Sequence, residues 1–183
     1  MSSCKLLYSI DLACGDTMYP AGLDGLLHAG YVQDLATPFS TTMATDITSV
    51  QFTAYNGLKR LQGVKYAHLS VIEGQVGAGG NVSLVHRMTL KLITNSTQDD
   101  AQILRLMQAT DIFFFAKDAR GEYKIVGPSG MKYAPGQLQS LGQAATDDVS
   151  DTLIFESTEI VKPLRFAPVG VTDITAYLNA RVV

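Results

Sequence analysis

The chain has 183 residues, of which 46% are hydrophobic and 17% are charged, and its formal net charge at pH 7 is −3. This length allows one well-buried domain plus an arm or a long loop. No basic cluster is available to neutralise phosphates, which argues against a protein that reads nucleic-acid sequence. No run of eighteen apolar residues predicts a membrane span, and the N-terminal residues lack a signal-peptide core, so we expect synthesis in the cytoplasm.

The first quarter of the chain alternates short apolar runs with turns. Residues 6–12 are a short apolar run, and residues 16–24 contain Pro, Gly and Asp in a pattern typical of turns. Residues 26–32 predict a strand, and Gly30 inside it indicates a bulge or a close backbone approach. Residues 38–46 are rich in Ser and Thr and predict a loop.

A long two-stranded ribbon is the strongest pattern in the sequence. Before it, apolar and polar side chains alternate over residues 47–55, which predicts a separate strand, and Asn56-Gly57 predicts a hairpin turn after that strand. Residues 64–76 and 82–93 then predict two long strands, joined by the Gly-rich tip Gly77-Ala78-Gly79-Gly80-Asn81. The apolar positions of the second strand are Val82, Leu84, His86, Met88, Leu90 and Leu92. A strand about twice the usual length overhangs a small core, and this indicates a protein that assembles with other subunits.

A helix follows the ribbon. Ser96 or Thr97 is suited to cap its N-terminus, and Asp99 and Asp100 are favoured in the first turn by the helix dipole. The helix is expected to end near Ala109. Its apolar stripe is predicted to comprise Ile103, Leu104 and Met107.

The second half of the chain is again predicted to be mainly β. Residues 111–117 are apolar on both faces, which indicates a central strand, and residues 118–121 predict a hairpin into residues 123–126. Residues 127–150 contain several Gly and Pro and are expected to be long and irregular. Residues 152–157 predict a further strand.

The tail carries Pro163, Pro168 and Gly170 and then a short helical pattern over residues 173–181. Two interpretations stay open for it. The helix is either a docking arm for another subunit or an element folded back on its own core.

No residue pattern predicts catalysis or a cofactor. The Gly-rich string 74–80 lies between two strands, whereas a phosphate-binding loop joins a strand to a helix. His86 lies on an apolar strand face, where a hydrogen-bonded histidine is the expected role. Cys14 could act as a nucleophile only beside a histidine. We therefore expect a protein that is not an enzyme and has no catalytic residue.

The cysteines and histidines give no metal-binding pattern. Cys4 and Cys14 are expected to be free thiols in a reducing compartment. His28, His68 and His86 are too widely spaced to complete a zinc site, so none is predicted.

The order of these elements resembles the tail-tube-like structural proteins of tailed bacteriophages, most closely those of Bacteroidales phages, including the crAss-like group. The resemblance covers about four-fifths of the chain. It is carried by "VSLVHRMTLKLIT", "TQDDAQILRLMQA", "DIFFFAKDARGEYKIVG" and "DTLIFESTE", and by Cys14, "AGLDG" and "LLHAGYVQD" near the start. Two features, Gly79-Gly80 and the tail beyond Pro168, are not typical of a plain tube subunit. A head–tail connector, a ring protein or a tail-completion protein with a related fold is therefore also possible.

The resemblance implies a mainly β fold, a β-sandwich or partly closed barrel flanked by one helix, with a long β-hairpin and a C-terminal arm. Residues 1–168 would form the β domain and residues 169–183 the arm. Such subunits assemble into rings, six-fold or a multiple, in the virion tail or connector. DNA passes through the lumen without sequence-specific binding, neighbouring tail proteins are the other partners, and no membrane is involved. The expected subunit contacts are Gly77, Gly79, Gly80, Asn81, Ile174, Tyr177 and Leu178.

A ligand-binding β-sandwich module of a tail fibre, specific for carbohydrate or a receptor, is the alternative function. Such modules usually display clustered aromatic side chains, often with Trp. This chain has no Trp, and its tyrosines are dispersed. The composition therefore favours the assembly hypothesis.

Overall fold

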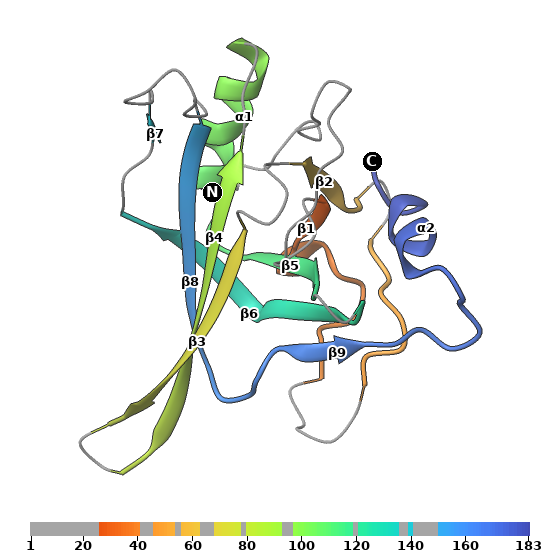
Figure 1. Ribbon diagram of the computed structural model, residues 1–183. Helices are drawn as coiled ribbons and strands as arrows, with labels where there is room; N and C mark the ends of the chain where they lie inside the picture. The colour runs from red at the N-terminus through yellow and green to blue at the C-terminus, as the bar shows by residue number, and fades with distance from the viewer. Residues whose placement is uncertain are drawn as a thin grey trace.

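The computed structural model describes residues 26–40, 46–53, 56–62, 68–77, 80–92, 97–118, 121–135, 139–140 and 150–183. Within them the fold is mainly β, with antiparallel strands in one sheet that does not close into a barrel (Figure 1). The predicted fold class, with its flanking helix and long hairpin, is confirmed. The apolar run 6–12, the turn 16–24 and the cysteines lie outside the described residues.

The described elements, in chain order, are β1 (Leu26–Tyr31), the 3-10 helix η1 (Val32–Asp34), β2 (Lys59–Gln62), β3 (Leu69–Val76), β4 (Val82–Leu92), α1 (Thr97–Met107), β5 (Ile112–Lys117), β6 (Tyr123–Ala134), β7 (Gln139–Ser140), β8 (Ser150–Glu159), β9 (Leu164–Phe166) and α2 (Ile174–Asn179). The strand order is β2-β1-β5-β6-β8-β4-β3. In addition, β7 pairs with β8 and β9 pairs with β6.

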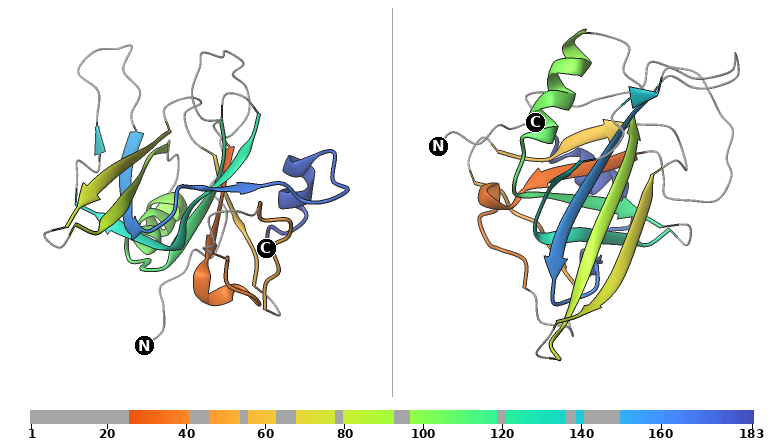
Figure 2. Two further views of the ribbon diagram at one scale, coloured as in Figure 1. Left: turned by 90° about the horizontal axis from the view of Figure 1, so that it is seen from below. Right: turned by 90° about the vertical axis from the view of Figure 1, so that its left-hand side faces the viewer.

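Strand β6 turns a corner and so belongs to both halves of the sheet. Its first part pairs with β5 and β9, whereas its last residues pair with β8. At the corner Gly127 and Gly130 adopt positive φ angles of 68° and 99°, which glycine tolerates because it has no Cβ. The two halves, β2-β1-β5 and β8-β4-β3, can therefore face one another across a core (Figure 2).

Two hydrophobic cores lie on opposite faces of the central strand β5. Phe114 belongs to the first, which α1, β1, β4 and β8 enclose. Phe113 and Phe115 belong to the second, which residues 35–39, 47–52 and 58, β9 and α2 cover. The prediction of a strand buried on both faces is confirmed. Gly30 of β1 also lies at a close approach, because a Cβ there would be 2.5 Å from Cζ of Phe113.

Residues 47–53, the described part of the strand predicted over residues 47–55, do not form a strand. Within the described residues Ile47 and Phe52 make isolated bridges, to Phe166 and Leu35 respectively. Asn56-Gly57 does not join a hairpin of neighbouring strands either, because β2 pairs with β1. The alternating pattern correctly predicted that one side-chain face is buried. A strand also needs a partner backbone along its length, and these residues lack one among the described strands. They bury the same side chains as a loop against the second core.

Two further expectations are corrected by the structure. Residues 127–150 are not irregular throughout, since β6 continues to Ala134 and a short β7 follows. In α1, whose first turn holds Asp99 and Asp100 as predicted, Leu104 is 57% exposed, whereas Leu106 is fully buried. The helix packs on the first core at a slightly different rotation from the one that the apolar pattern indicated.

Candidate functional site: the protruding ribbon

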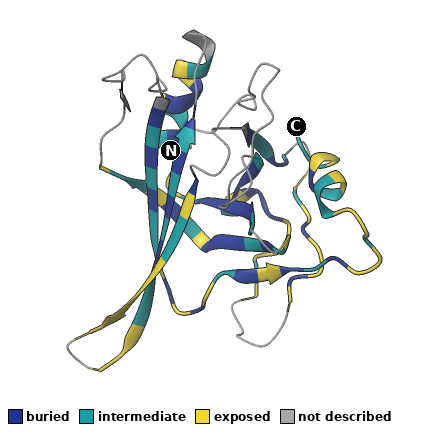
Figure 3. Ribbon diagram, in the orientation of Figure 1, coloured by how far each residue is buried: buried dark blue, intermediate teal, exposed yellow. Residues whose placement is uncertain are grey.

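The ribbon of β3 and β4 extends beyond the body of the protein (Figure 1). Eight consecutive residue pairs join the two strands, from Leu69 opposite Thr89 to Val76 opposite Val82, with no bulge. On its other edge β4 pairs with β8 only from Leu84 onward. The outer part of the ribbon is therefore a two-stranded hairpin, and most of its residues are exposed (Figure 3).

One face of this hairpin is apolar and exposed. Opposite residues in an antiparallel pair point to the same side, so Ile72, Val76, Val82 and Leu84 share the face that Met88 presents to the first core. Met88 is fully buried, whereas Val82 and Val76 are 65% and 73% exposed. The core face of the sheet thus continues into solvent as the apolar ribbon face, which is the kind of surface that a partner covers.

The backbone edge of β3 is open to pairing as far as the described strands show, because β3 ends the strand order. Natural edge strands are usually protected by charged side chains, proline, bulges or short length. Strand β3 has eight regularly paired residues, no proline and one charged side chain, Glu73. It retains little protection against strand addition.

The opposite face of the ribbon is held by an ion-pair cluster. Arg87 on β4 donates from Nε to Glu156 on β8, and its Nη1 lies 3.6 Å from Glu73 on β3. The hydrogen bond and charge of Glu156 raise the pKa of Arg87. These side chains are substantially exposed, so the cluster contributes little to the free energy of unfolding. It links three neighbouring strands.

A buried polar network lies where the ribbon leaves the body. The carbonyl of Val161 accepts a hydrogen bond from Nε2 of His86 at 2.9 Å, and the N–H of Gly127 donates to Nδ1 at 3.4 Å. Nearby, the carboxylate of Glu159 accepts hydrogen bonds from Ser129 and Ser157. Burial lowers the pKa of His86, although the charge of Glu159 acts in the opposite direction.

This network is structural. Both ring nitrogens of His86 are engaged by the backbone, so neither is directed at a substrate proton, and the ring is fully buried. The predicted hydrogen-bonded role of His86 is confirmed. No local pattern pointed to Glu159, which stands at the end of an ordinary strand pattern.

The Gly-rich tip is a turn, as predicted. The N–H of Gly77 donates to the carbonyl of Asn81 at 2.8 Å, and Gly80 has a φ of 78°. Gly79 lies outside the described residues. The described contact residues of the tip, Gly77, Gly80 and Asn81, are thus at the far end of the ribbon.

The C-terminal residues with the same predicted role lie elsewhere. Helix α2 packs on the second core, with Leu178 fully buried and Ile174 and Tyr177 packed against it. Asp173 caps the helix by accepting from the N–H of Ala176. The helix is therefore folded back on its own chain, and Leu178 has no side-chain surface left for a second subunit.

A groove lies at the base of the ribbon, on the same side as the apolar ribbon face, and we name it the base groove. Its volume is about 340 Å³. Its lining comprises Ser70, Ile72, Ala116, Asp118, Lys124, Val126, Lys162 and Pro163. The lining combines an apolar floor with two lysines and one aspartate.

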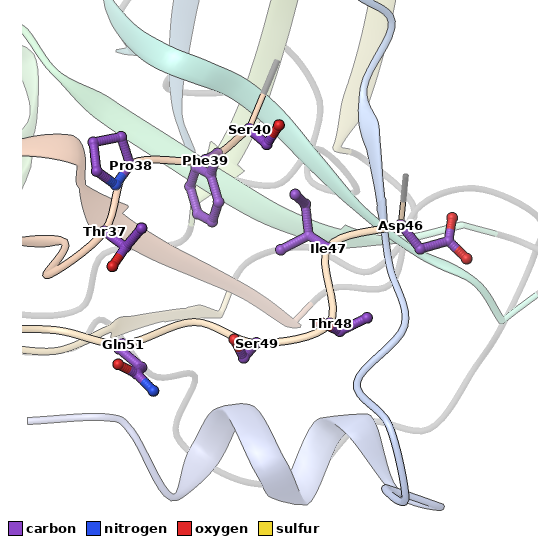
Figure 4. A pocket seen from close by; sticks show the side chains of 9 residues that line it. All are labelled: Thr37, Pro38, Phe39, Ser40, Asp46, Ile47, Thr48, Ser49 and Gln51. Atoms are coloured by element: carbon purple, nitrogen blue, oxygen red, sulfur yellow. The ribbon is translucent and has the colours of Figure 1, made fainter. Parts of the chain in front are cut away.

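A second groove, of about 350 Å³, lies between residues 37–40 and 46–51 (Figure 4). Hydroxyl groups, the carboxylate of Asp46 and the amide of Gln51 line it around Phe39. The Phe39 ring packs edge-on against Phe113, with centroids 4.9 Å apart, so it is partly committed to the second core.

Within the described part of the chain, no cluster of three or more His, Cys, Asp or Glu side chains is placed to hold a metal ion. Neither described helix has the length and apolar character needed to cross a membrane. Comparisons with protein family models, with curated proteins and with solved structures found no match.

Proposed function

We propose that the protein is a virion structural subunit that self-assembles into a ring or tube of a phage tail or head–tail connector, through which DNA passes. The observation that carries self-assembly is the protruding ribbon, with its exposed apolar face and its regular edge strand β3. The resemblance of the sequence to tail-tube-like proteins supplies the virion context.

A partner copy would cover the exposed apolar face of the ribbon and pair with its open edge. Covering Ile72, Val76 and Val82 takes apolar surface out of water, and pairing along β3 satisfies exposed backbone groups. A ribbon that contacts a different surface of the next copy makes a head-to-tail interface, and such interfaces close into rings when the rotation permits. We expect a ring that is six-fold or a multiple of six.

The first test is the mass of the purified full chain in solution across a concentration series, by analytical ultracentrifugation with negative-stain images of the largest species. We expect rings or tubes with an open channel. A monomer at every concentration would contradict self-assembly by the isolated protein.

A shortened ribbon tests the role of this element. Replacing residues 76–82 by Asn-Gly, which closes two-residue hairpin loops, keeps Gln75 opposite Ser83 and should leave a folded monomer, because the core does not depend on the tip. Thermal unfolding checks the fold and sedimentation checks the oligomer. Val76→Thr with Val82→Thr should weaken assembly in the same direction, and Ser83→Thr, on the opposite face, serves as the matched control. An unchanged oligomer in the shortened protein would refute the role.

The alternative, a carbohydrate- or receptor-binding module, is favoured by one observation, the polar groove beside Phe39. Hydroxyl, carboxylate and amide groups around an aromatic ring suit a hydroxylated ligand. Saturable binding on a glycan array, lost in Gln51→Ala, would support this function over assembly.

A further inference from the structure

The exposed side of helix α1 carries an apolar side chain between polar ones. Leu104 is 57% exposed, and Asp100 lies one turn before it on the same side. Ile103 and Leu106, which point to the other side, are buried in the first core. The helix therefore presents an acidic and apolar face on which Asp100 and Leu104 are exposed.

The base groove has the complementary character. Ile72, Val126 and Pro163 are among its apolar lining residues, and Lys162, Lys124 and Asp118 are its charged ones. Lys124, in the same groove, is paired with Glu122 at 2.8 Å. Lys162 is exposed, and among the described residues it has no ion-pair partner. The same is true of Asp100.

We propose that α1 of one copy docks in the base groove of the next copy, with Leu104 on the apolar floor and Asp100 facing Lys162. This inference rests on the self-assembly proposed above and adds a second contact beside the ribbon. Complementary charge selects the partner and the orientation, while the buried leucine supplies apolar contact.

The two surfaces are placed for a head-to-tail contact. Helix α1 lies at the opposite end of the molecule from the turn between β8 and β9, which carries Lys162 (Figures 1 and 2). One copy cannot bring its own α1 to its own groove, so each copy offers one surface to each neighbour. A contact of this type builds rings or stacks when the two surfaces of one copy meet two different neighbours.

Charge reversal in the full chain tests the pairing. Asp100→Lys and Lys162→Glu should each raise the concentration at half-assembly about tenfold, because each variant brings two like charges together at the interface. The double variant D100K/K162E should return to within about threefold of the wild type, since the pair is restored in reverse. An equimolar mixture of the two single variants should also assemble, because each protein then meets a complementary neighbour on both sides.

Lys132→Glu, an equal charge change at an exposed position of β6, is the matched control, and thermal unfolding verifies that each variant is folded. If the wild type assembles and both reversals leave assembly unchanged, this contact is refuted and the proposed function stands. The pairing is also refuted if assembly is weakened in the single variants and neither the double variant nor the mixture restores it. A wild type that stays monomeric at every concentration refutes the proposed function, and this contact with it.

Discussion

Gly127 lies where strand β6 passes from one half of the sheet to the other. Between Ile112 and Phe114 the pairing of β5 with β6 changes register, and residues 127–130 lie at the step. Extra residues in one strand of a pair bend that strand, and here residues 127–130, which stand opposite Phe113 alone, turn β6 through the corner. The N–H of Gly127 also donates to the ring of His86, so the corner is tied to the base of the ribbon.

Gly127→Ala should destabilise the protein by about 2–4 kcal/mol, since the new Cβ has an unfavourable positive φ and overlaps the buried side chain of Met131. Urea unfolding at neutral pH measures the effect. Gly74→Ala is the matched control: it lies in β3, no heavy atom is within 4 Å of the position that its Cβ would take, and its change should stay within about 0.5 kcal/mol. Equal effects of the two substitutions would contradict this role of the corner.

Among the elements, the last helix acts as a lid on the second core. Leu178 enters that core, and the Tyr123 and Thr175 hydroxyl groups are hydrogen-bonded at 2.6 Å. Arg181 donates to the carbonyl of Tyr177 and lies over its ring, 3.5 Å from the centroid. A helix of six residues is too short to be stable alone, so these contacts hold it in place.

Leu178→Ala should lower the free energy of unfolding by about 2–4 kcal/mol, because it removes a fully buried side chain and leaves a cavity. Val169→Ala, at a position that is 82% exposed, provides the control from the same segment and should change stability by less than about 0.5 kcal/mol. The comparison is made by chemical denaturation at a concentration where the protein is monomeric. A small effect of Leu178→Ala would indicate that α2 is not held on the core in solution.

Across the whole molecule, two buried histidines join segments that are distant in the chain. Nε2 of His28 on β1 lies 2.8 Å from Oδ1 of Asn179 on α2, and His86 joins β4 to Val161. Burial lowers the pKa of both side chains, and the charge of Arg60 adds to the effect at His28. A proton added to either ring would have to bind at Nδ1. In His86 this atom already accepts a hydrogen bond from the N–H of Gly127. In His28 it is buried and has no hydrogen-bond partner among the described groups.

Stability should therefore fall as the pH decreases below about 6.5, the ordinary histidine value. The unfolded chain then binds protons that the folded protein excludes, so each histidine contributes a slope of up to about 1.4 kcal/mol per pH unit until its lowered pKa is reached. Urea unfolding at pH 7.5, 6.0 and 5.0 measures the slope. His28→Gln, which retains a donor for Asn179, should reduce it, and an identical slope in this variant would contradict the assignment to His28.

Much of the candidate site could be predicted from local sequence. Alternation of apolar residues located β4, glycine and asparagine located the tip, and the apolar run 112–115 located the central strand, because each pattern depends on residues close in the chain. The exposure of Leu104 and the base groove could not be predicted in this way. Both depend on the rotation and placement of elements that pack across the fold.

The mainly β class, the long ribbon and the positions of both helices follow from the amino-acid sequence alone, since strand periodicity, turn residues and helix caps act over a few residues. Three features became apparent only in the folded chain: β6 turns between the two halves of the sheet, residues 47–53 cover a core without forming a strand, and α2 folds back on its own chain. These outcomes depend on which distant surfaces pack against one another. The local sequence pattern of a buried side chain is the same whichever part of the fold covers it.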